Sequence, residues 1–291
     1  MGEERLHRSA VEVETTMTRT LTTLRGVALL AVGVGFLLAS RVATAQDELP
    51  AASYKCYPAK TIPGTTQFPR GVAFPLADQF HDSSLTRFLA LYELCTPVSK
   101  DGEEIPNPAV HLMCYKVSDP AVRGRFLVDV TDQFGTESLI AANERTVCLP
   151  ALKNPQACDP ETETCPSLDD VEFQENFYGC YDARPARDTS PLIDPSDPIV
   201  VDLADQFETK STDVYKTHAL CNPLVEPLDP ERHLKCYDIR DHVDTEEPQT
   251  PFAGAEATVV DELSNEFTEE GWQLRLGRPN QLCETATKSV R

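Results

Sequence analysis

The sequence lacks the motifs by which common catalytic and metal-binding proteins are identified. Gly-x-Ser-x-Gly, His-Glu-x-x-His and a glycine-rich phosphate loop are all absent. Zinc sites with closely spaced ligands use Cys-x-x-Cys or Cys-x-x-His, and neither occurs. No Asn-x-Ser/Thr sequon is present, which leaves no case for N-glycosylation. These absences favour a protein that is not an enzyme, and we assign no catalytic, cofactor-binding or metal-ligating residue.

Helical periodicity and positive charge are also scarce. Beyond residue 45 the chain has no sustained i, i+3, i+4 apolar pattern and no run of the roughly 20 apolar residues that a membrane-spanning helix needs. Against 47 Asp and Glu there are 26 Lys and Arg, so the formal net charge is −21. Such a surface repels phosphate groups, which argues against nucleic acids and anionic membranes as partners.

One apolar run does occur near the start, over residues 26–39. Arg25 precedes this run, and the small-residue sequence 43–45 follows it, which is the layout of a secretory signal peptide. We therefore expect a signal peptide over residues 1–45, with Met17 as an alternative start. An uncleaved anchor is the other interpretation, but the run is short for a membrane span. The expected location is secreted or periplasmic.

The chain has ten cysteines, and all of them lie beyond residue 45. An even number of cysteines in an exported chain predicts a disulfide framework, whereas the spacing does not suit zinc. The cysteines are Cys56, Cys95, Cys114, Cys148, Cys158, Cys165, Cys180, Cys221, Cys236 and Cys283.

A five-residue motif recurs between these cysteines. Leu-Ala-Asp-Gln-Phe at 76–80 is repeated at 203–207, and copies at 130–134 and 263–267 keep part of it. Each copy lies between a Cys-Tyr pair and a second cysteine, so the chain contains four repeats. We number them one (53–100), two (111–153), three (177–224) and four (233–288). The motif residues are Asp78, Gln79, Phe80, Asp132, Gln133, Phe134, Asp205, Gln206, Phe207 and Phe267.

The repeats alternate in how they begin. Repeats one and three open with Tyr-x-Cys-Tyr, and repeats two and four open with His-Leu-x-Cys-Tyr. This alternation predicts duplication of a two-repeat unit, with β domains at 46–153 and 173–291 of ordinary domain size. The segment 154–172 between them is acidic and proline-rich, which predicts a linker, and its Cys158 and Cys165 are expected to pair with each other.

The apolar residues alternate with a period of two. Phe126, Val128 and Val130 fall on one face of a strand, as do their counterparts in repeats one and three. In repeat four one residue is inserted, and Glu262 is the expected β-bulge. The predicted fold class is all-β, with two tandem small β-barrel or sandwich domains, each built from two three-stranded repeats and held by disulfides. Pairing of the two cysteines of each repeat and pairing across repeats, such as Cys95 with Cys114, both fit the count.

The Asp-Gln-Phe motif admits two interpretations. The aspartates could line cation sites, or each could accept backbone N–H bonds in a turn while the phenylalanine packs in the core. We favour the structural role, because no calcium-loop pattern accompanies the motif. A weak Ca²⁺ site is a separate possibility in the linker, through Asp159, Glu161 and Glu163.

The combination of His-Leu-x-Cys-Tyr, Asp-Gln-Phe and Leu-Cys-x-Pro, the last at 94–97 and 220–223, resembles a repeat family of secreted bacterial proteins described as a domain of unknown function. The resemblance implies a bacterial exported protein and brings no activity. We expect a non-enzymatic extracellular or cell-envelope binding or scaffold module with an unknown ligand. The alternatives are a cell-surface hydrolase that uses carboxylates brought together across strands, and a calcium-dependent adhesion module.

Overall fold

The computed structural model describes residues 52–69, 71–119, 124–154, 168, 175–224, 227–244, 248–268 and 270–291. The expected signal peptide, the bridge between Cys158 and Cys165 and the acidic calcium loop lie outside these residues and stay predictions. No helix within the described residues is long and apolar enough to cross a membrane.

The expectation of an all-β, disulfide-held protein is confirmed. Within the described residues fourteen strands form one sheet, and the pairings between them are antiparallel. The first seven strands are β1 (Ser53–Thr61), β2 (Ala73–Asp78), β3 (His81–Pro97), β4 (Ser99–Lys100), β5 (His111–Ser118), β6 (Arg125–Asp132) and β7 (Gly135–Lys153). The others are β8 (Tyr178–Pro185), β9 (Ile199–Ala204), β10 (Thr209–Pro223), β11 (His233–Asp241), β12 (Ala255–Asp261), β13 (Trp272–Leu276) and β14 (Gln281–Val290), and one helix, α2 (Glu262–Phe267), follows β12.

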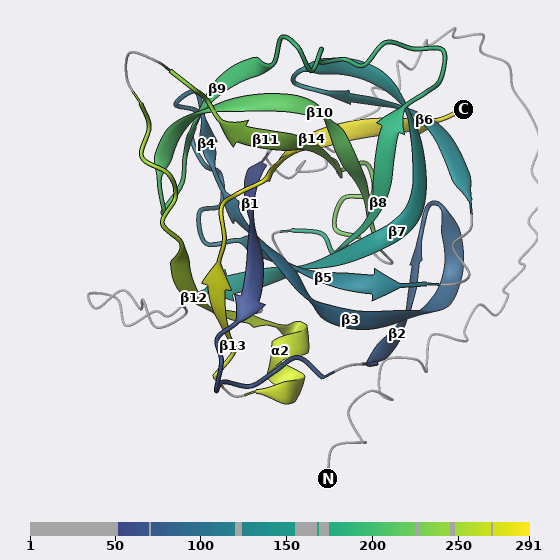
Figure 1. Ribbon diagram of the computed structural model, residues 1–291. Helices are drawn as coiled ribbons and strands as arrows, with labels where there is room; N and C mark the ends of the chain where they lie inside the picture. Colours follow the sequence, from purple (N-terminus) through teal and green to yellow (C-terminus); the bar gives the residue numbers. More distant parts are fainter. Residues whose placement is uncertain are drawn as a thin grey trace, which may run out of the picture. The chain divides into compact units, whose positions relative to one another are not determined.

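Eight of the strands close into a ring, which Figure 1 shows end-on. Going around it, β1 pairs with β3, β3 with β5, β5 with β7 and β7 with β8. The ring continues through β10, β11 and β14, and β14 pairs back with β1. Each repeat contributes its Cys-Tyr strand and the strand that carries its second cysteine.

The expected division into two tandem domains is not confirmed. Residues 46–291 form one compact unit, and strands of all four repeats share the ring. The physical reason lies in the pairing between repeats: the second cysteine strand of one repeat bonds to the Cys-Tyr strand of the next. Two repeats alone would leave two open edges with unpaired N–H and C=O groups, whereas in the ring of four repeats each of the eight strands is paired on both sides.

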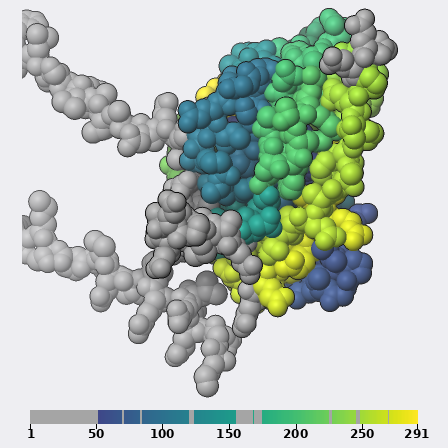
Figure 2. All heavy atoms as spheres, turned by 90° about the vertical axis from the view of Figure 1, so that its left-hand side faces the viewer, coloured from purple at the N-terminus to yellow at the C-terminus, as the bar shows by residue number. Residues whose placement is uncertain are grey.

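Among the remaining strands, β4, β6, β9 and β12 tie opposite repeats together. Strand β6 of repeat two pairs with β14 of repeat four, and β12 of repeat four pairs with β7 of repeat two. Strand β9 of repeat three pairs with β4, at the end of repeat one. Figure 2 shows this face, where green residues of repeat three lie between blue residues of repeat one and yellow-green residues of repeat four.

Alternation along the strands separates an inner core from an outer one. The cysteines pack with Ala52, Tyr54, Leu112, Tyr178 and Leu234 in one cluster inside the ring. The tyrosines that directly follow the first cysteines belong to other clusters, which lie between the ring and the outer strands. Successive residues of a strand point to opposite faces, so each Cys-Tyr pair places one side chain in each core.

Repeat four departs from the sequence prediction. Glu262 is not a β-bulge: it is the first residue of α2, for which Asp261 is the N-cap. Asp261 and Ser264 form a capping box, in which Oδ1 of Asp261 accepts from the Ser264 backbone N–H at 2.6 Å. These local bonds make a helical turn possible in a segment without helical periodicity. In repeat two, β7 continues past Pro150 and pairs there with β12 of repeat four.

Candidate functional site

The interior of the ring contains four disulfides, one for each repeat. In each bridge the two cysteines stand directly opposite each other on paired strands. The pairs are Cys56–Cys95, Cys114–Cys148, Cys180–Cys221 and Cys236–Cys283. Sulfurs of neighbouring bridges approach to 3.9 Å in three places, which is van der Waals contact because an oxidised sulfur carries no hydrogen.

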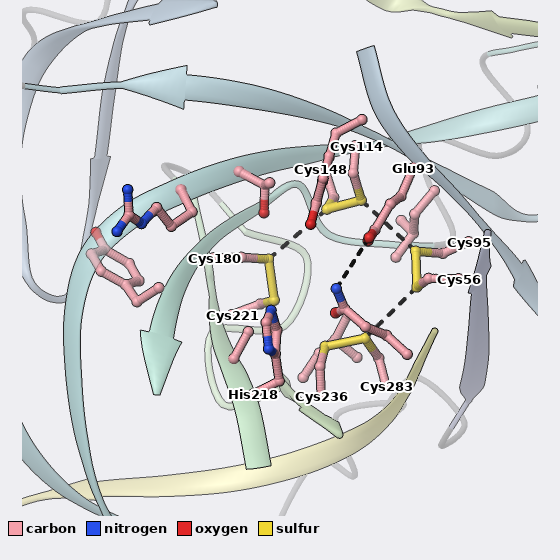
Figure 3. A pocket seen from close by; sticks show the side chains of 18 of the residues that line it. Cys56, Glu93, Cys95, Cys114, Cys148, Cys180, His218, Cys221, Cys236 and Cys283 are labelled. Atoms are coloured by element: carbon pink, nitrogen blue, oxygen red, sulfur yellow. Dashed lines mark hydrogen bonds between the residues drawn. A yellow bond between two sulfur atoms is a disulfide. The ribbon is translucent and has the colours of Figure 1, made fainter. Parts of the chain in front are cut away.

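These bridges line a cavity of about 390 Å³ at one end of the barrel. All eight bridged cysteines contribute to its wall, and Figure 3 shows the four sulfur pairs surrounding one space. Leu89, Leu112 and Leu234 add apolar surface. A cavity of this size with a mainly apolar wall and a few polar groups is typical of small-molecule sites.

The opposite end of the barrel is closed by a buried polar network. Glu175 accepts hydrogen bonds from the hydroxyls of Tyr54 at 2.6 Å and Tyr178 at 2.7 Å. Arg232 donates to the same carboxylate at 2.9 Å, and all four residues are at most 3% exposed. The two tyrosines are the opening residues of repeats one and three, where repeats two and four have leucine. The alternation between repeats therefore furnishes two hydroxyls for one shared carboxylate.

Glu93 is the most unusual residue of the cavity. It lies two positions before Cys95 on β3, so its side chain points inward like that of the cysteine. The side chain of Gln281 donates to its carboxylate at 3.1 Å. Burial raises the pKa of Glu93 to about 7, although the neighbouring His218 and a hydrogen bond from Tyr92 favour the ionised form. At neutral pH this carboxyl group exists in both protonation states.

The mouth of the cavity carries several charges around Glu93. His218 lies 3.2 Å from a carboxylate oxygen of Asp238, and this hydrogen bond raises the pKa of the imidazole. Arg145 pairs with Asp182 at 2.8 Å. These four side chains are 37–64% exposed, in contrast to the closed end. The mouth of the cavity is therefore open to solvent, while Glu93 lies behind it and is 3% exposed.

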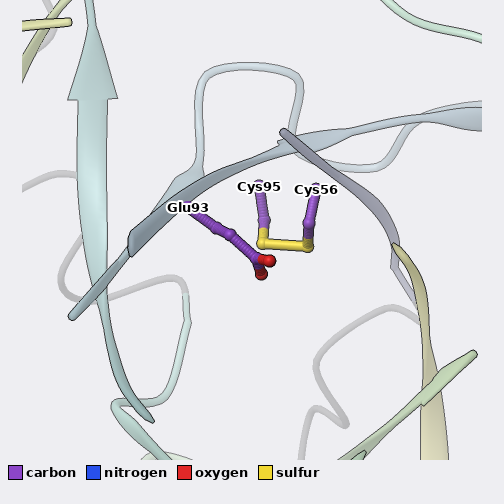
Figure 4. Close-up of side chains that lie close together, drawn as sticks. All are labelled: Cys56, Glu93 and Cys95. Carbon is purple, nitrogen blue, oxygen red and sulfur yellow. A yellow bond between two sulfur atoms is a disulfide. The ribbon is translucent and has the colours of Figure 1, made fainter. Parts of the chain in front are cut away.

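Glu93 and the first bridge do not form a metal site. The carboxylate lies beside the sulfurs of Cys56 and Cys95, as Figure 4 shows, and the three groups are close enough to suggest a cation site. Cysteine binds metals as a thiolate, however, and both sulfurs are consumed in the disulfide. The sulfurs instead provide a polarisable apolar wall.

The Asp-Gln-Phe aspartates are placed away from the cavity, in the outer core. One carboxylate oxygen accepts backbone N–H groups in the turn, as in Asp78, whose Oδ1 accepts from Phe80 at 2.7 Å. The equivalent bonds of Asp132 and Asp205 go to Phe134 at 3.0 Å and Phe207 at 2.9 Å. These are the turn bonds expected of an aspartate that follows a strand.

The second oxygen of each aspartate faces a Cys-Tyr tyrosine of the opposite repeat. Asp205 accepts from the hydroxyl of Tyr57 at 2.6 Å, and the Phe207 ring meets the Tyr57 ring edge-on at 5.2 Å. We call such a hydrogen bond, from a Cys-Tyr tyrosine to a turn aspartate of the opposite repeat, a clasp. Its counterparts are Tyr237 with Asp132 and Tyr115 with Asp261, both at 2.5 Å. The fourth pairing places Asp78 next to Tyr181. Oδ2 of Asp78 also accepts a hydrogen bond from the side chain of Asn222 at 2.9 Å.

The other motif residues have separate roles. The side chain of Gln79 donates to the carbonyl of Pro230 at 3.2 Å, and that of Gln206 donates to the His111 ring at 2.7 Å, while Gln133 is exposed. Phe267 is partly buried against the largest core cluster. In repeat four the aspartate of the clasp is Asp261, not a residue of the drifted copy at 263–267, because the inserted helix displaces that copy.

Sequence reasoning missed Glu93, His218 and Glu175. For Glu93 the sequence contained a usable pattern. A residue two positions before an inward-facing cysteine on the same strand also points inward, so a glutamate at that position is predicted to be buried. His218 and Glu175 have no such signal, because their partners come from other repeats.

No family model, curated protein or solved structure matches this chain.

Proposed function

We propose that this chain is an exported binding module that holds a small amine with a compact apolar body in the mouth of the disulfide-lined cavity. The observation that carries the proposal is Glu93, a buried carboxylate within a cavity whose wall is mainly sulfur and apolar carbon. An ammonium group would form a charge-assisted hydrogen bond with this carboxylate, while the apolar body packs on the bridges and leucines.

Export is supported by the disulfides and by the leader pattern. Four bridges in the described residues indicate an oxidising compartment, since cytosolic thiols are kept reduced. The resemblance to a repeat family of secreted bacterial proteins adds the expectation of a bacterial periplasm or medium. The scaffold is stiff, because the bridges cross-link neighbouring strands at the centre of the ring.

The charges at the mouth favour binding over hydrolysis. Asp182 and Asp238, the other carboxylates of the mouth, are ion-paired with Arg145 and His218. They do not combine with Glu93 into the pair of free carboxylates by which most glycoside hydrolases act.

A titration of phenethylamine into the mature protein at pH 8 tests the proposal. We expect one site per chain and a loss of about 10- to 100-fold in affinity in Glu93→Gln, the magnitude of a hydrogen bond to a charged group. The matched control Glu256→Gln alters an exposed glutamate and should bind as the wild type does. Equal affinity in Glu93→Gln, or equal binding of the neutral phenylethanol, would refute the proposal.

A cell-surface hydrolase is the second candidate, and one observation favours it. A pKa of about 7 suits Glu93 for general acid–base catalysis. Chromogenic esters and glycosides offered to the wild type and to Glu93→Gln distinguish the two functions. Turnover that disappears in the variant would replace the binding proposal by the hydrolase.

A further inference from the structure

The residue before the first cysteine of each repeat points into the outer core, beneath the clasp. It is lysine in repeats one and four, and each lysine forms an ion pair with a glutamate that is at most 9% exposed at its side chain. The ammonium of Lys55 lies 2.8 Å from Oε1 of Glu208, and that of Lys235 lies 3.1 Å from Oε2 of Glu137. Both lysines are at most 1% exposed, so these pairs are shielded from water.

In repeat three the same position is Gly179, and no ammonium can come from it. The space is filled by Glu144 of β7: a Cβ added to Gly179 would lie 2.7 Å from Oε1 of that glutamate. Glu144 is 6% exposed, and neither of its oxygens accepts a hydrogen bond from the described residues. Its carboxyl group therefore occupies space into which the lysine side chain extends in repeats one and four.

Further ligand-type groups converge on Glu144. One ligand atom each from His81, Asp119 and Glu144 lie within 4.8 Å of one another. Nε2 of His81 is buried without a hydrogen-bond partner in the described residues, and it is 3.7 Å from Oδ1 of Asp78. Ligand atoms around a tetrahedral ion are roughly 3.3 Å apart at metal–ligand distances near 2 Å, so a small side-chain adjustment closes the site.

The arrangement of acidic groups at the site calls for a cation. The carboxyl groups of Asp119 and Asp78 lie close to the buried carboxyl group of Glu144. Lys288 is also nearby, but its ammonium donates to Asn222 and lies 4.2 Å from the centre of the Phe80 ring. A buried carboxylate without a partner is costly, and a bound cation would remove that cost.

We infer that His81, Asp119 and Glu144 bind a divalent transition-metal ion such as Zn²⁺, which takes the place of the lysine ammonium of repeats one and four. The imidazole distinguishes this site from a calcium or magnesium site, where the ligands are oxygens. The ion would tie β3 of repeat one to β7 of repeat two next to the Asp78 turn. Its role is structural and independent of the cavity around Glu93.

Calorimetry with Zn²⁺ on the chelator-treated mature protein, its disulfides intact, tests this site. We expect one Zn²⁺ per chain, a higher melting temperature, and an affinity lowered on the order of 100-fold in Glu144→Gln, since a direct ligand is lost. Glu256→Gln is the matched control and should retain the wild-type affinity. Gly179→Lys supplies the ammonium of the other repeats once the flexible Glu144 side chain shifts to admit it, so the variant should no longer bind Zn²⁺.

Three outcomes would overturn the inference. They are the absence of heat and of any melting shift with Zn²⁺, unchanged Zn²⁺ affinity in Glu144→Gln, and stabilisation by Ca²⁺ in preference to Zn²⁺. If Glu144→Gln fails to fold, His81→Gln gives the same test, because it removes the imidazole from a residue that is not fully buried.

Discussion

The hydroxyl of Tyr237 donates a hydrogen bond to Oδ2 of Asp132, which lies 105 positions earlier in the chain and in the opposite repeat. Tyr115 makes the reciprocal bond to Asp261, so repeats two and four clasp each other in both directions. The same aspartates hold their own turns together with the other oxygen. One carboxylate thus joins local turn formation to the closure of the whole ring.

Tyr237→Phe should therefore destabilise the whole ring. Removing the hydroxyl leaves Oδ2 of Asp132 without its donor, and we expect a loss of about 1–3 kcal/mol in the free energy of unfolding. Denaturant unfolding followed by the fluorescence of the single, fully buried Trp272 measures it. Tyr215→Phe is the control, because the hydrogen bond from the Tyr215 hydroxyl to Asp213 is long, at 3.3 Å, and Tyr215 is partly exposed. Equal stability of the two variants would contradict the clasp.

The closed end of the barrel gives a second prediction. Glu175→Gln leaves the buried Arg232 without its counter-charge, and we expect a loss of about 3–5 kcal/mol. The exposed pair of Glu256 with Arg275 provides a comparison, since Glu256→Gln should change stability by about 0–1 kcal/mol. Urea unfolding of both variants measures the two changes in the free energy of unfolding. A similar small effect in both would mean that the network does not hold the barrel end.

The disulfide connectivity can be tested against a close alternative. The sulfurs of Cys95 and Cys114 belong to different bridges yet lie 3.9 Å apart, so distance alone permits the wrong pairing. The strand register instead places Cys95 opposite Cys56 and Cys114 opposite Cys148. Peptide mapping without reduction should find these pairs, each worth about 4 kcal/mol by chain entropy. A peptide linking Cys95 to Cys114 would contradict the register.

The raised pKa of Glu93 makes stability depend on pH. The folded protein keeps this proton up to about pH 7, whereas the unfolded chain releases it near 4.5. The native state binds more protons between these values, so the contribution of Glu93 falls as pH rises through the window. Relative to Glu93→Gln, the wild type should lose up to about 3 kcal/mol of stability between pH 4.5 and 8. If the difference in stability between the wild type and Glu93→Gln stays constant over this pH range, the pKa of Glu93 is not raised.

The strands themselves could be predicted from the sequence. Val128 and Val130 alternate with polar residues, and both are fully buried. The cysteine count and the leader pattern predicted disulfides, and four are present in the described residues. Periodicity reports which face of a strand is buried, and this was sufficient for the fold class.

The partners of the strands could not be predicted in the same way. Nothing in the sequence of β1 indicates that this strand pairs with β14, more than 220 residues later. The alternation of Tyr54 and Tyr178 with leucines in the other repeats favoured two separate domains. The structure explains that alternation by Glu175, which binds both tyrosines. Ring closure is a property of pairing between repeats, and a repeat pattern alone does not specify it.

The titration of Glu93 itself, followed by carboxyl-carbon NMR with and without phenethylamine, tests the proposed binding site most directly. In the free protein the Glu93 signal should titrate near pH 7, and saturating amine should move that midpoint downward because the ammonium favours the carboxylate. A midpoint near 4.5 in the free protein, or one that the amine leaves unchanged, would contradict the account.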